Sequence, residues 1–274
     1  MIVFPNAKIN LGLNITSRRP DGYHILSTAM MPTGWKDILE IVPAQGTQPT
    51  LTVTGRTVDC PMESNLVMKA YRAMQRIAPI PPVDIYLHKI IPDGAGLGGG
   101  SADAAFTLKA LDRMFSLGLT DSQLADIAAT LGADCPFFIY NRPMIADGIG
   151  TDLSAVDIPD LQGHTLLIVK PGIHISTARA YAGVTPCPTA QDLRLTLSLP
   201  VAEWRGALKN DFEDSLRSEF PEIERIKQTL YANGAAYASL SGSGSAVYGI
   251  FDNDKMAVHA KSLFSGCDTF KCSL

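Results

Sequence analysis

The sequence has few cysteines, no long apolar run and no basic run. Its five cysteines are scattered and odd in number, without the close spacing of a zinc or redox motif. We therefore expect reduced thiols and a cytoplasmic location rather than a disulfide framework. No apolar stretch approaches the roughly 20 residues that span a bilayer, so we expect no membrane partner. The first residues carry no basic leader, which predicts no signal peptide.

Charge is also scarce in this chain of 274 residues. Charged residues make up 18% of it, hydrophobic residues 46%, and the formal net charge is −4. Without a basic stripe we expect no nucleic-acid partner, and the composition is too apolar for disorder. A bound polyphosphate must therefore be held by backbone donors and a few placed cations. For the oligomeric state we expect a monomer or a weak homodimer.

Apolar periodicity predicts alternating strands and helices in the first half. Apolar residues at 9, 11, 13 and 15 alternate with polar residues or glycine, which predicts a strand with one buried and one polar face. Further strands are expected at 38–42, 51–53 and 83–87. Helices are expected behind an N-cap at Ser64, behind another at Ser101, and behind a capping box of Thr120 and Gln123, the last ending at Gly132.

The second half predicts a different order of elements. Residues 147–163 are polar and turn-rich, which is typical of a domain junction. Beyond them we expect strands at 165–170, 236–240, 246–251 and 269–272, and helices near 203–217, 222–232 and 255–264. The order β-α-β-β-α-β suggests a ferredoxin-like domain. We therefore expect an α+β chain with domains at 1–157 and 158–274.

The strongest local signal is the glycine-rich segment at residues 92–101, Pro-Asp-Gly-Ala-Gly-Leu-Gly-Gly-Gly-Ser. It lies between a predicted strand and a helix expected to begin near Ala102. Successive glycines allow positive φ and a close approach of the backbone to an anion. Exposed N–H groups at a helix N-terminus then bind phosphate oxygens. The segment therefore predicts a phosphate-binding loop rather than a flexible turn.

Two other phosphate loops were weighed against this segment. A Walker loop ends in Gly-Lys-Ser/Thr, and no lysine is present here. The Rossmann spacing does match formally, at Gly94, Gly96 and Gly99. That motif needs a strand after its helix, whereas here the helix leads into another helix. An NAD-binding oxidoreductase therefore stays only as the minor alternative.

Four segments together resemble a known family. Residues 92–105 resemble the phosphate loop of the GHMP kinases, the superfamily of galactokinase, homoserine kinase and mevalonate kinase. Residues 5–11 and 19–24 resemble the start of those members that phosphorylate 4-diphosphocytidyl-2-C-methyl-D-erythritol. Residues 131–137 resemble their catalytic-aspartate segment, and 240–245 the third glycine motif. The resemblance implies the two-domain GHMP kinase fold, with a ribosomal-protein-S5-like α/β domain followed by a ferredoxin-like domain.

The resemblance also implies a reaction and two catalytic residues. The γ-phosphoryl group of ATP, with Mg²⁺, would pass to the 2-hydroxyl of the methylerythritol moiety, in the non-mevalonate route to isopentenyl diphosphate. Asp134 would accept the hydroxyl proton, and Lys8 would stabilise charge beside it. By themselves, Asp134 resembles a helix cap and Lys8 an exposed strand lysine. A homoserine or mevalonate kinase, and a nucleotide-binding protein without catalysis, stay as alternatives.

The remaining site residues follow from the same resemblance. Asn10 would orient the substrate, Tyr23 and His24 would read the cytosine, and Tyr181 would stack on its other face. Thr177 would contact the methylerythritol or its phosphates, and Gly242 the substrate phosphates. The ATP phosphates would lie on Pro92, Gly94, Gly96, Leu97, Gly98, Gly99, Gly100 and Ser101.

Several assignments stay open at this point. Asn65 and Lys89 are weaker predictions for the nucleoside, since Asn65 equally suits a helix cap and Lys89 a solvated surface. No residue is predicted as a metal ligand. Asp93 and Asp103 place acids beside the phosphate loop, where they either weaken ATP binding or hold Mg²⁺ through water. The segment Asn210-Asp211-Phe212-Glu213 resembles a short family motif without an assigned role.

Overall fold

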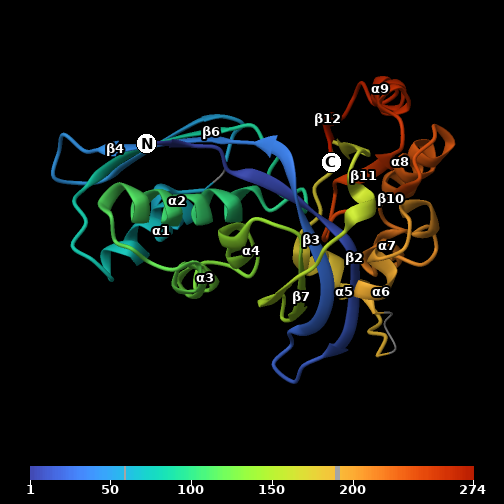
Figure 1. Ribbon diagram of the computed structural model, residues 1–274, viewed down its shortest axis with the longest axis horizontal. Coiled ribbons are helices and arrows are strands. Elements are labelled where there is room, and N and C mark those ends of the chain that lie inside the picture. The colour runs from blue at the N-terminus through green and yellow to red at the C-terminus, as the bar shows by residue number, and fades with distance from the viewer. Residues whose placement is uncertain (59, 189–191) are drawn as a thin grey trace. The chain divides into compact units, whose positions relative to one another are not determined.

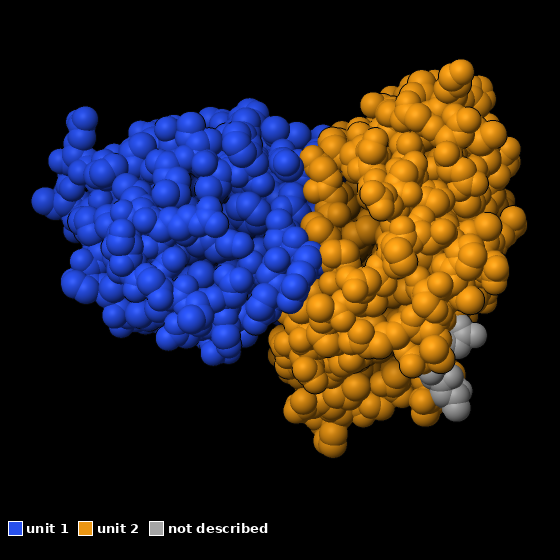
Figure 2. Space-filling model, viewed as in Figure 1, with its two compact units in different colours: residues 1–7, 35–93, 98–142 blue, residues 8–34, 94–97, 143–274 orange. Residues whose placement is uncertain are grey.

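The computed structural model describes residues 1–58, 60–188 and 192–274. The chain forms two compact units that alternate along the sequence. Unit 1 comprises Met1–Ala7, Trp35–Asp93 and Gly98–Arg142, and unit 2 comprises Lys8–Gly34, Gly94–Leu97 and Pro143–Leu274 (Figure 2). The linear boundary expected between residues 157 and 158 stays a prediction.

Unit 1 is a four-stranded sheet with helices on one face (Figure 1). The strand order is β1 (Ile2–Val3), β4 (Ile38–Pro43), β6 (Val83–Lys89) and β5 (Thr50–Gly55), with β5 parallel to β6 and the other pairs antiparallel. Helices α1 (Leu66–Gln75) and α2 (Gly99–Phe115) pack on each other and bury apolar residues against the sheet. Helices α3 (Asp121–Ala129) and α4 (Cys135–Tyr140) follow, and the Thr120–Gln123 capping box is confirmed.

Unit 2 contains two sheets. The first has the order β2 (Asn6–Arg18), β3 (His24–Lys36), β7 (Met144–Gly148) and β8 (Asp152–Ala155). The second is antiparallel throughout, in the order β10 (Tyr237–Leu240), β11 (Val247–Phe251), β9 (Thr165–Lys170) and β12 (Asp268–Ser273). Helices α8 (Pro221–Ala232) and α9 (Asp254–Ser262) pack on it. Chain order and strand pairing together confirm the predicted ferredoxin-like arrangement.

Short helices connect these elements. In unit 1 a 3₁₀ turn, Met62–Ser64, precedes α1. In unit 2 the short segments are the 3₁₀ turns Pro159–Leu161 and Val201–Glu203 and the helices α5 (Thr177–Ala182), α6 (Leu193–Leu197) and α7 (Phe212–Leu216). Apolar side chains of α7, α8, β9, β10 and β11 form a continuous buried core in this unit. Among the described residues, no helix is long and apolar enough to cross a membrane.

Four predicted helix boundaries are wrong. Helix α3 ends at Ala129 and not at the predicted Gly132. The N-cap of α1 is Asn65, not Ser64, because Ser64 belongs to the preceding 3₁₀ turn and the Asn65 side chain accepts from Val67 N. Helix α2 begins at Gly99 behind Gly98, whose φ is +70°, so Ser101 lies inside the first turn and does not cap it. The helix expected at 203–217 is only Phe212–Leu216, because Asn210 pairs with Leu13 of β2.

Some strands of the structure were not predicted from the sequence. The expected junction at 147–163 contains most of the β7–β8 hairpin. Strand β3 was not predicted, although it has 13 residues. The polar face of β2 is buried as well as the apolar one, with Lys8 only 4% and Asn10 only 2% exposed. The burial of polar residues on a strand already indicates that they have partners.

Candidate active site

Lys8 and Asn10 form a buried polar pair on one face of β2. Lys8 Nζ donates to Asn10 Oδ1 at 2.5 Å, and Asn10 Nδ2 donates to Thr28 Oγ1 of β3 at 2.9 Å. An ammonium group this deeply buried costs free energy unless polar partners surround it. The alternative of an exposed strand lysine is therefore wrong. These hydrogen bonds fix the orientation of the Asn10 amide and hold the Lys8 ammonium beside it.

Part of the glycine-rich segment lies against the same strand. Lys8 N donates to Leu97 O at 2.9 Å. Gly96 has φ +73°, and a Cβ added there would lie 2.0 Å from Ser241 O, so no side chain fits. Ser241 Oγ donates to Gly96 O at 2.8 Å and accepts from Asn10 N at 3.3 Å. Within unit 2, the structure thus brings together predicted residues of the phosphate loop and of the acceptor site.

Glycines give the loop the backbone form that an anion site needs. Gly94, Gly96 and Gly98 all have positive φ, between +58° and +73°. Gly98 precedes α2, whose first N–H groups have no partner within the helix. A helix of 17 residues also carries a positive dipole end there. The chain passes from unit 1 into unit 2 at Gly94 and returns at Gly98.

A buried ion network lies beside the start of this loop in unit 1. Lys89 Nζ pairs with Asp37 Oδ2 and with Asp103 Oδ2, the latter at 2.6 Å, and all three side chains are at most 5% exposed. Asp37 Oδ1 accepts from Ile90 N at 2.5 Å and Ile91 N at 2.8 Å. Lys89 therefore ties the end of β6 to Asp103 near the start of α2. The alternative of a solvated Lys89 is therefore wrong.

The two carboxylates of this network are not equivalent. Asp37 has three donors, whereas Asp103 Oδ1 is buried without a hydrogen-bond partner among the described residues. Burial raises the pKa of Asp103 to about 7, even though the charge of Lys89 opposes this shift. For Lys89, burial disfavours the charge, but the attraction of Asp103 and Asp37 outweighs it and raises the pKa. The network holds Lys89 charged and leaves Asp103 near its titration point at neutral pH.

Replacing Asp103 by Asn should change how stability depends on pH. The folded pKa of about 7 exceeds the usual value of 3.8, so the folded state binds the proton more tightly than the unfolded state. The stability that Asp103 contributes is therefore fully present below pH 3.8 and is lost as the pH rises through its folded pKa of about 7. We expect the urea midpoint of the wild type to fall between pH 5.5 and pH 8, and to fall less in Asp103→Asn. The control is Asp126→Asn, at an exposed position. If the urea midpoint of Asp103→Asn falls with pH as steeply as that of the control, the raised pKa does not belong to Asp103.

A cavity of about 180 Å³ adjoins this network in unit 1. Its lining comprises Val58, Cys60, Ser64, Asn65, Leu66, Leu87, Lys89, Asp93, Gly100 and Asp103. It thus brings together both residues predicted for the nucleoside and one glycine predicted for the phosphates. The Asn65 amide oxygen accepts from Val67 N at 3.0 Å and the Lys89 ammonium is held by carboxylates. Their direct contact with a nucleoside stays a prediction.

Asp134 stands immediately before α4 in unit 1. It occupies the N-cap position, but its side chain makes no capping hydrogen bond and its φ and ψ are helical. The alternative role as a helix cap is therefore not supported. The neighbouring Cys135 is fully buried, and burial raises the pKa of its thiol to about 11, so it is not a thiolate at neutral pH. Lys8 belongs to unit 2, and its pairing with Asp134 stays a prediction.

An aromatic stack in unit 2 contains two of the residues predicted to bind cytosine. The rings of His24 and Tyr181 are stacked, with centroids 4.7 Å apart and planes at 21°. Burial and the charge of Arg18 both lower the pKa of His24, which favours the neutral imidazole. Tyr23 is 66% exposed beside them. Thr177 Oγ1 lies 3.4 Å from Ser243 Oγ. A base between Tyr23 and Tyr181 stays a prediction.

Some contributors to these contacts were missed by sequence reasoning. Thr28 lies on the unpredicted strand β3. Tyr248 of β11 donates its hydroxyl hydrogen to Asn10 O at 2.8 Å. The sequence around Tyr248 predicts only that this residue belongs to a strand of the core. Asp37 gave no signal because its partners lie more than 50 residues away.

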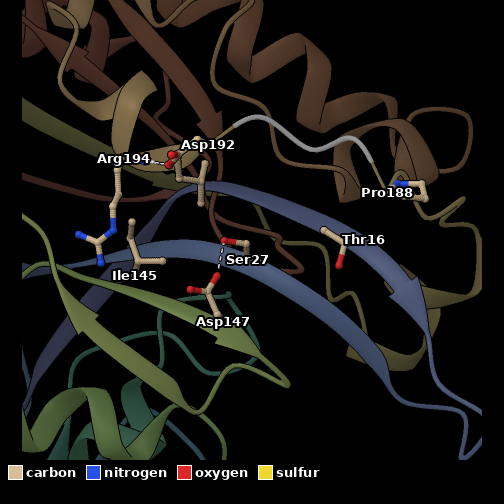
Figure 3. A pocket seen from close by; sticks show the side chains of 8 residues that line it. Thr16, Ser27, Ile145, Asp147, Pro188, Asp192 and Arg194 are labelled. Carbon is tan, nitrogen blue, oxygen red and sulfur yellow. Dashed lines mark hydrogen bonds between the residues drawn. The ribbon is translucent and has the colours of Figure 1, made fainter.

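A second cavity, of about 220 Å³, lies in unit 2 (Figure 3). Residues lining it are Thr16, Ser27, Ile145, Asp147, Pro188, Asp192, Leu193 and Arg194. Ser27 Oγ donates to Asp147 Oδ1 at 2.6 Å, which joins β3 to β7 in Figure 3. None of the predicted site residues belongs to this lining, so the cavity is separate from the Lys8–Asn10 pair.

Comparisons with known proteins decide the family. Models of the GHMP kinases N terminal domain and the GHMP kinases C terminal match residues 65–142 and 200–262. A 4-diphosphocytidyl-2-C-methyl-D-erythritol kinase of Parabacteroides distasonis is 50% identical over 269 residues, which cover 97% of each chain. The chain belongs to this family of GHMP kinases. The kinase of Bacteroides fragilis with the same name is 49% identical over 93% of each chain.

Solved structures of GHMP kinases have the same fold. A crystal structure of a 4-(cytidine 5'-diphospho)-2C-methyl-D-erythritol kinase has a TM-score of 0.81 and 31% identity, covering 99% of this chain and 98% of that one. The mevalonate kinase of Methanococcus jannaschii has a TM-score of 0.73 at 16% identity, covering 100% of this chain and 98% of that one, which shows the fold alone. The predicted two-domain GHMP kinase fold is thus confirmed.

Proposed function

We propose that this GHMP kinase transfers the γ-phosphoryl group of ATP to the 2-hydroxyl of 4-diphosphocytidyl-2-C-methyl-D-erythritol. The products are the 2-phosphate and ADP, on the non-mevalonate route to isopentenyl diphosphate. The observation that carries this proposal is the contact between the phosphate loop and the strand of Lys8 and Asn10, where Lys8 N bonds Leu97 O. It sets an anion-binding backbone directly beside a buried ammonium and a fixed amide.

Each residue then has a role in phosphoryl transfer. Such a reaction needs positioning and charge stabilisation rather than a covalent intermediate. The Asp134 carboxylate takes the proton of the 2-hydroxyl as that oxygen bonds to the γ-phosphorus and the bond to ADP breaks. The Lys8 ammonium stabilises the charge in transit, and Asn10 orients the hydroxyl. The burial of Lys8 and Asn10 and the hydrogen bond between them support these two roles.

ATP would be held mainly by backbone groups. The N–H groups of residues 98–101 suit its phosphates, and the cavity beside Lys89 suits the nucleoside. Among the described residues no group of three or more His, Cys, Asp or Glu could hold a metal ion. Within the described part of the chain, Asp103 offers a single unpartnered oxygen, Oδ1, because Oδ2 is paired with Lys89, and it belongs to no such group. We propose that Mg²⁺ enters with the ATP phosphates. The roles proposed for Asp134, Lys8 and Asn10 do not depend on a metal held by the protein.

The experiment that tests the function is turnover by the purified protein. With ATP, Mg²⁺ and the cytidine diphosphate substrate, we expect ADP release and formation of a 2-phosphate detected by phosphorus NMR. Homoserine and mevalonate should give no ADP above background. Turnover of either compound, without turnover of the cytidine substrate, would assign the chain to another GHMP activity. A cytoplasmic location and a monomer or weak homodimer stay predictions.

Replacing Tyr181 by Ala should weaken binding of the cytidine substrate. Stacking of a base on an aromatic ring contributes about 1–3 kcal/mol, so we expect KM for this substrate to rise roughly 5- to 150-fold. KM for ATP should stay close to the wild-type value. Exposed Tyr86 of β6 offers a matched control, Tyr86→Ala. An unchanged KM for the cytidine substrate in Tyr181→Ala would remove Tyr181 from the base site.

A further inference from the structure

Asn210 holds the start of a glycine turn in unit 2. Its side chain is fully buried, and Nδ2 donates to Leu240 O and to Gly242 O, both at 2.9 Å. Its Oδ1 accepts from Phe212 N at 3.0 Å. Both amide hydrogens and the carbonyl oxygen therefore have partners, which is the full donor capacity of an asparagine side chain. Such an amide fixes the turn that follows β10 in one conformation.

The turn held by Asn210 lies directly against the acceptor-site residues. Gly242 has φ +53°, and a Cβ added there would lie 3.2 Å from Asn10 Oδ1. Ser241, one residue earlier, bonds both Asn10 N and Gly96 O. A shift of this turn would therefore move the surroundings of Asn10 and of the phosphate loop together.

The acids on either side of Phe212 attach the same segment to two strands. Asp211 N donates to Leu13 O at 2.9 Å, and Asp211 Oδ2 accepts from Ile15 N at 2.7 Å, so the segment pairs alongside β2. Glu213 Oε1 accepts from Leu240 N at 2.9 Å and from Ser239 Oγ at 2.8 Å on β10. Strand β2 carries Lys8 and Asn10 nearer its start. The acids thus hold β2 and β10 at a fixed separation.

Phe212 links this segment to the aromatic stack. Its side chain is 2% exposed, and its ring meets that of Tyr181 edge to face, with centroids 4.8 Å apart and planes at 89°. Tyr181 in turn stacks on His24. Edge-to-face contacts restrict the orientation of an aromatic ring. The Tyr181 ring is therefore held between its stacking contact with His24 and its perpendicular contact with Phe212.

We infer that Asn210, Asp211, Phe212 and Glu213 form a positioning element for the acceptor substrate. The inference rests on the proposed function. Asn210 sets the Ser241–Gly242 turn beside Asn10, where the hydroxyl reacts, and Phe212 sets Tyr181, where the cytosine stacks. The four residues touch no substrate atom themselves. They keep the two ends of one substrate molecule at the separation that the reaction requires.

The test uses Phe212→Leu in the full-length protein. We expect KM for the cytidine substrate to rise roughly 3- to 10-fold, because the Tyr181 ring loses its edge contact. KM for ATP should not change. The matched control is Phe251→Leu, which removes a buried ring from the same core. A merely structural role would make both variants lose the same fraction of active enzyme without a change in KM. If Phe212→Leu is insoluble, Phe212→Met replaces it.

A double variant separates action through Tyr181 from a general loss of packing. In the Tyr181→Ala background, Phe212→Leu should raise KM by less than about twofold further, because its route to the base is already gone. A full additional rise, or an unchanged KM in Phe212→Leu alone, would overturn the inference. Wild-type turnover of the cytidine substrate is measured first, so that failure of the proposed function is recognised separately.

The Asn210 contact has its own variant. Asn210→Ser removes both donors to the Ser241–Gly242 turn, and we expect kcat for the cytidine substrate to fall roughly tenfold through misplacement of Asn10. ATP binding, measured by fluorescence titration, should be unchanged. A wild-type kcat in this variant would overturn the assignment of Asn210.

Discussion

Replacement of Asp134 by Asn is expected to lower kcat by a factor of roughly 10²–10⁴, the usual contribution of a positioned general base. Asparagine keeps the size of the side chain but cannot accept the hydroxyl proton. Because Asp134 lies before α4 and is assigned to the acceptor hydroxyl, KM for ATP should stay within about twofold. Steady-state kinetics with both substrates varied would measure the two effects.

Stability measurements distinguish this chemical role from a structural one. Asparagine matches aspartate in size, so Asp134→Asn should remain folded, and its free energy of unfolding should change much less than the activation free energy does. Exposed Asp126→Asn on α3 is the matched control and should leave kcat unchanged. Near-normal turnover in Asp134→Asn would reject Asp134 as the proton acceptor.

The parts of the fold predicted from sequence are those with local signals. Strands β9 to β12 and helices α8 and α9 have clear apolar periodicity and turn residues between them, and their order confirmed the ferredoxin-like domain. The capping box at Thr120 needs only two residues three positions apart. Strand β3 has no such signal, because buried residues occur consecutively at 28–31 and Pro32 interrupts the pattern. Apolar alternation cannot identify a strand that is buried on both faces.

The candidate site shows the same division. The glycines at 94, 96 and 98 predict a phosphate loop, and their positive φ values fit that prediction. The alternation around Lys8 predicted its face of β2, but not its burial, because a polar face is equally compatible with solvent and with buried partners. The network of Asp37, Lys89 and Asp103 joins residues up to 66 positions apart in sequence. Periodicity carries no information about such pairs.

Replacing Lys89 by Met should strongly lower the free energy of unfolding. Met keeps the length of the side chain but removes the ammonium that faces two buried carboxylates. Breaking a buried ion pair from one side costs about 3–5 kcal/mol, because an uncompensated charge is left inside. Urea unfolding followed by circular dichroism would measure the loss.

A second substitution tests whether charge, rather than packing, is the cause. Asp103→Asn added to Lys89→Met removes one of the two buried acids that have lost their cation. It removes with it the cost of burying that acid as a charge or of protonating it, so the double variant should be more stable than Lys89→Met alone. Exposed Lys69→Met on α1 is the control and should be neutral within about 0.5 kcal/mol. If Lys89→Met unfolds no more readily than Lys69→Met, the network does not stabilise unit 1. If the added Asp103→Asn lowers stability further, the cost of Lys89→Met comes from lost packing and hydrogen bonds, because relief of a buried charge has the opposite sign.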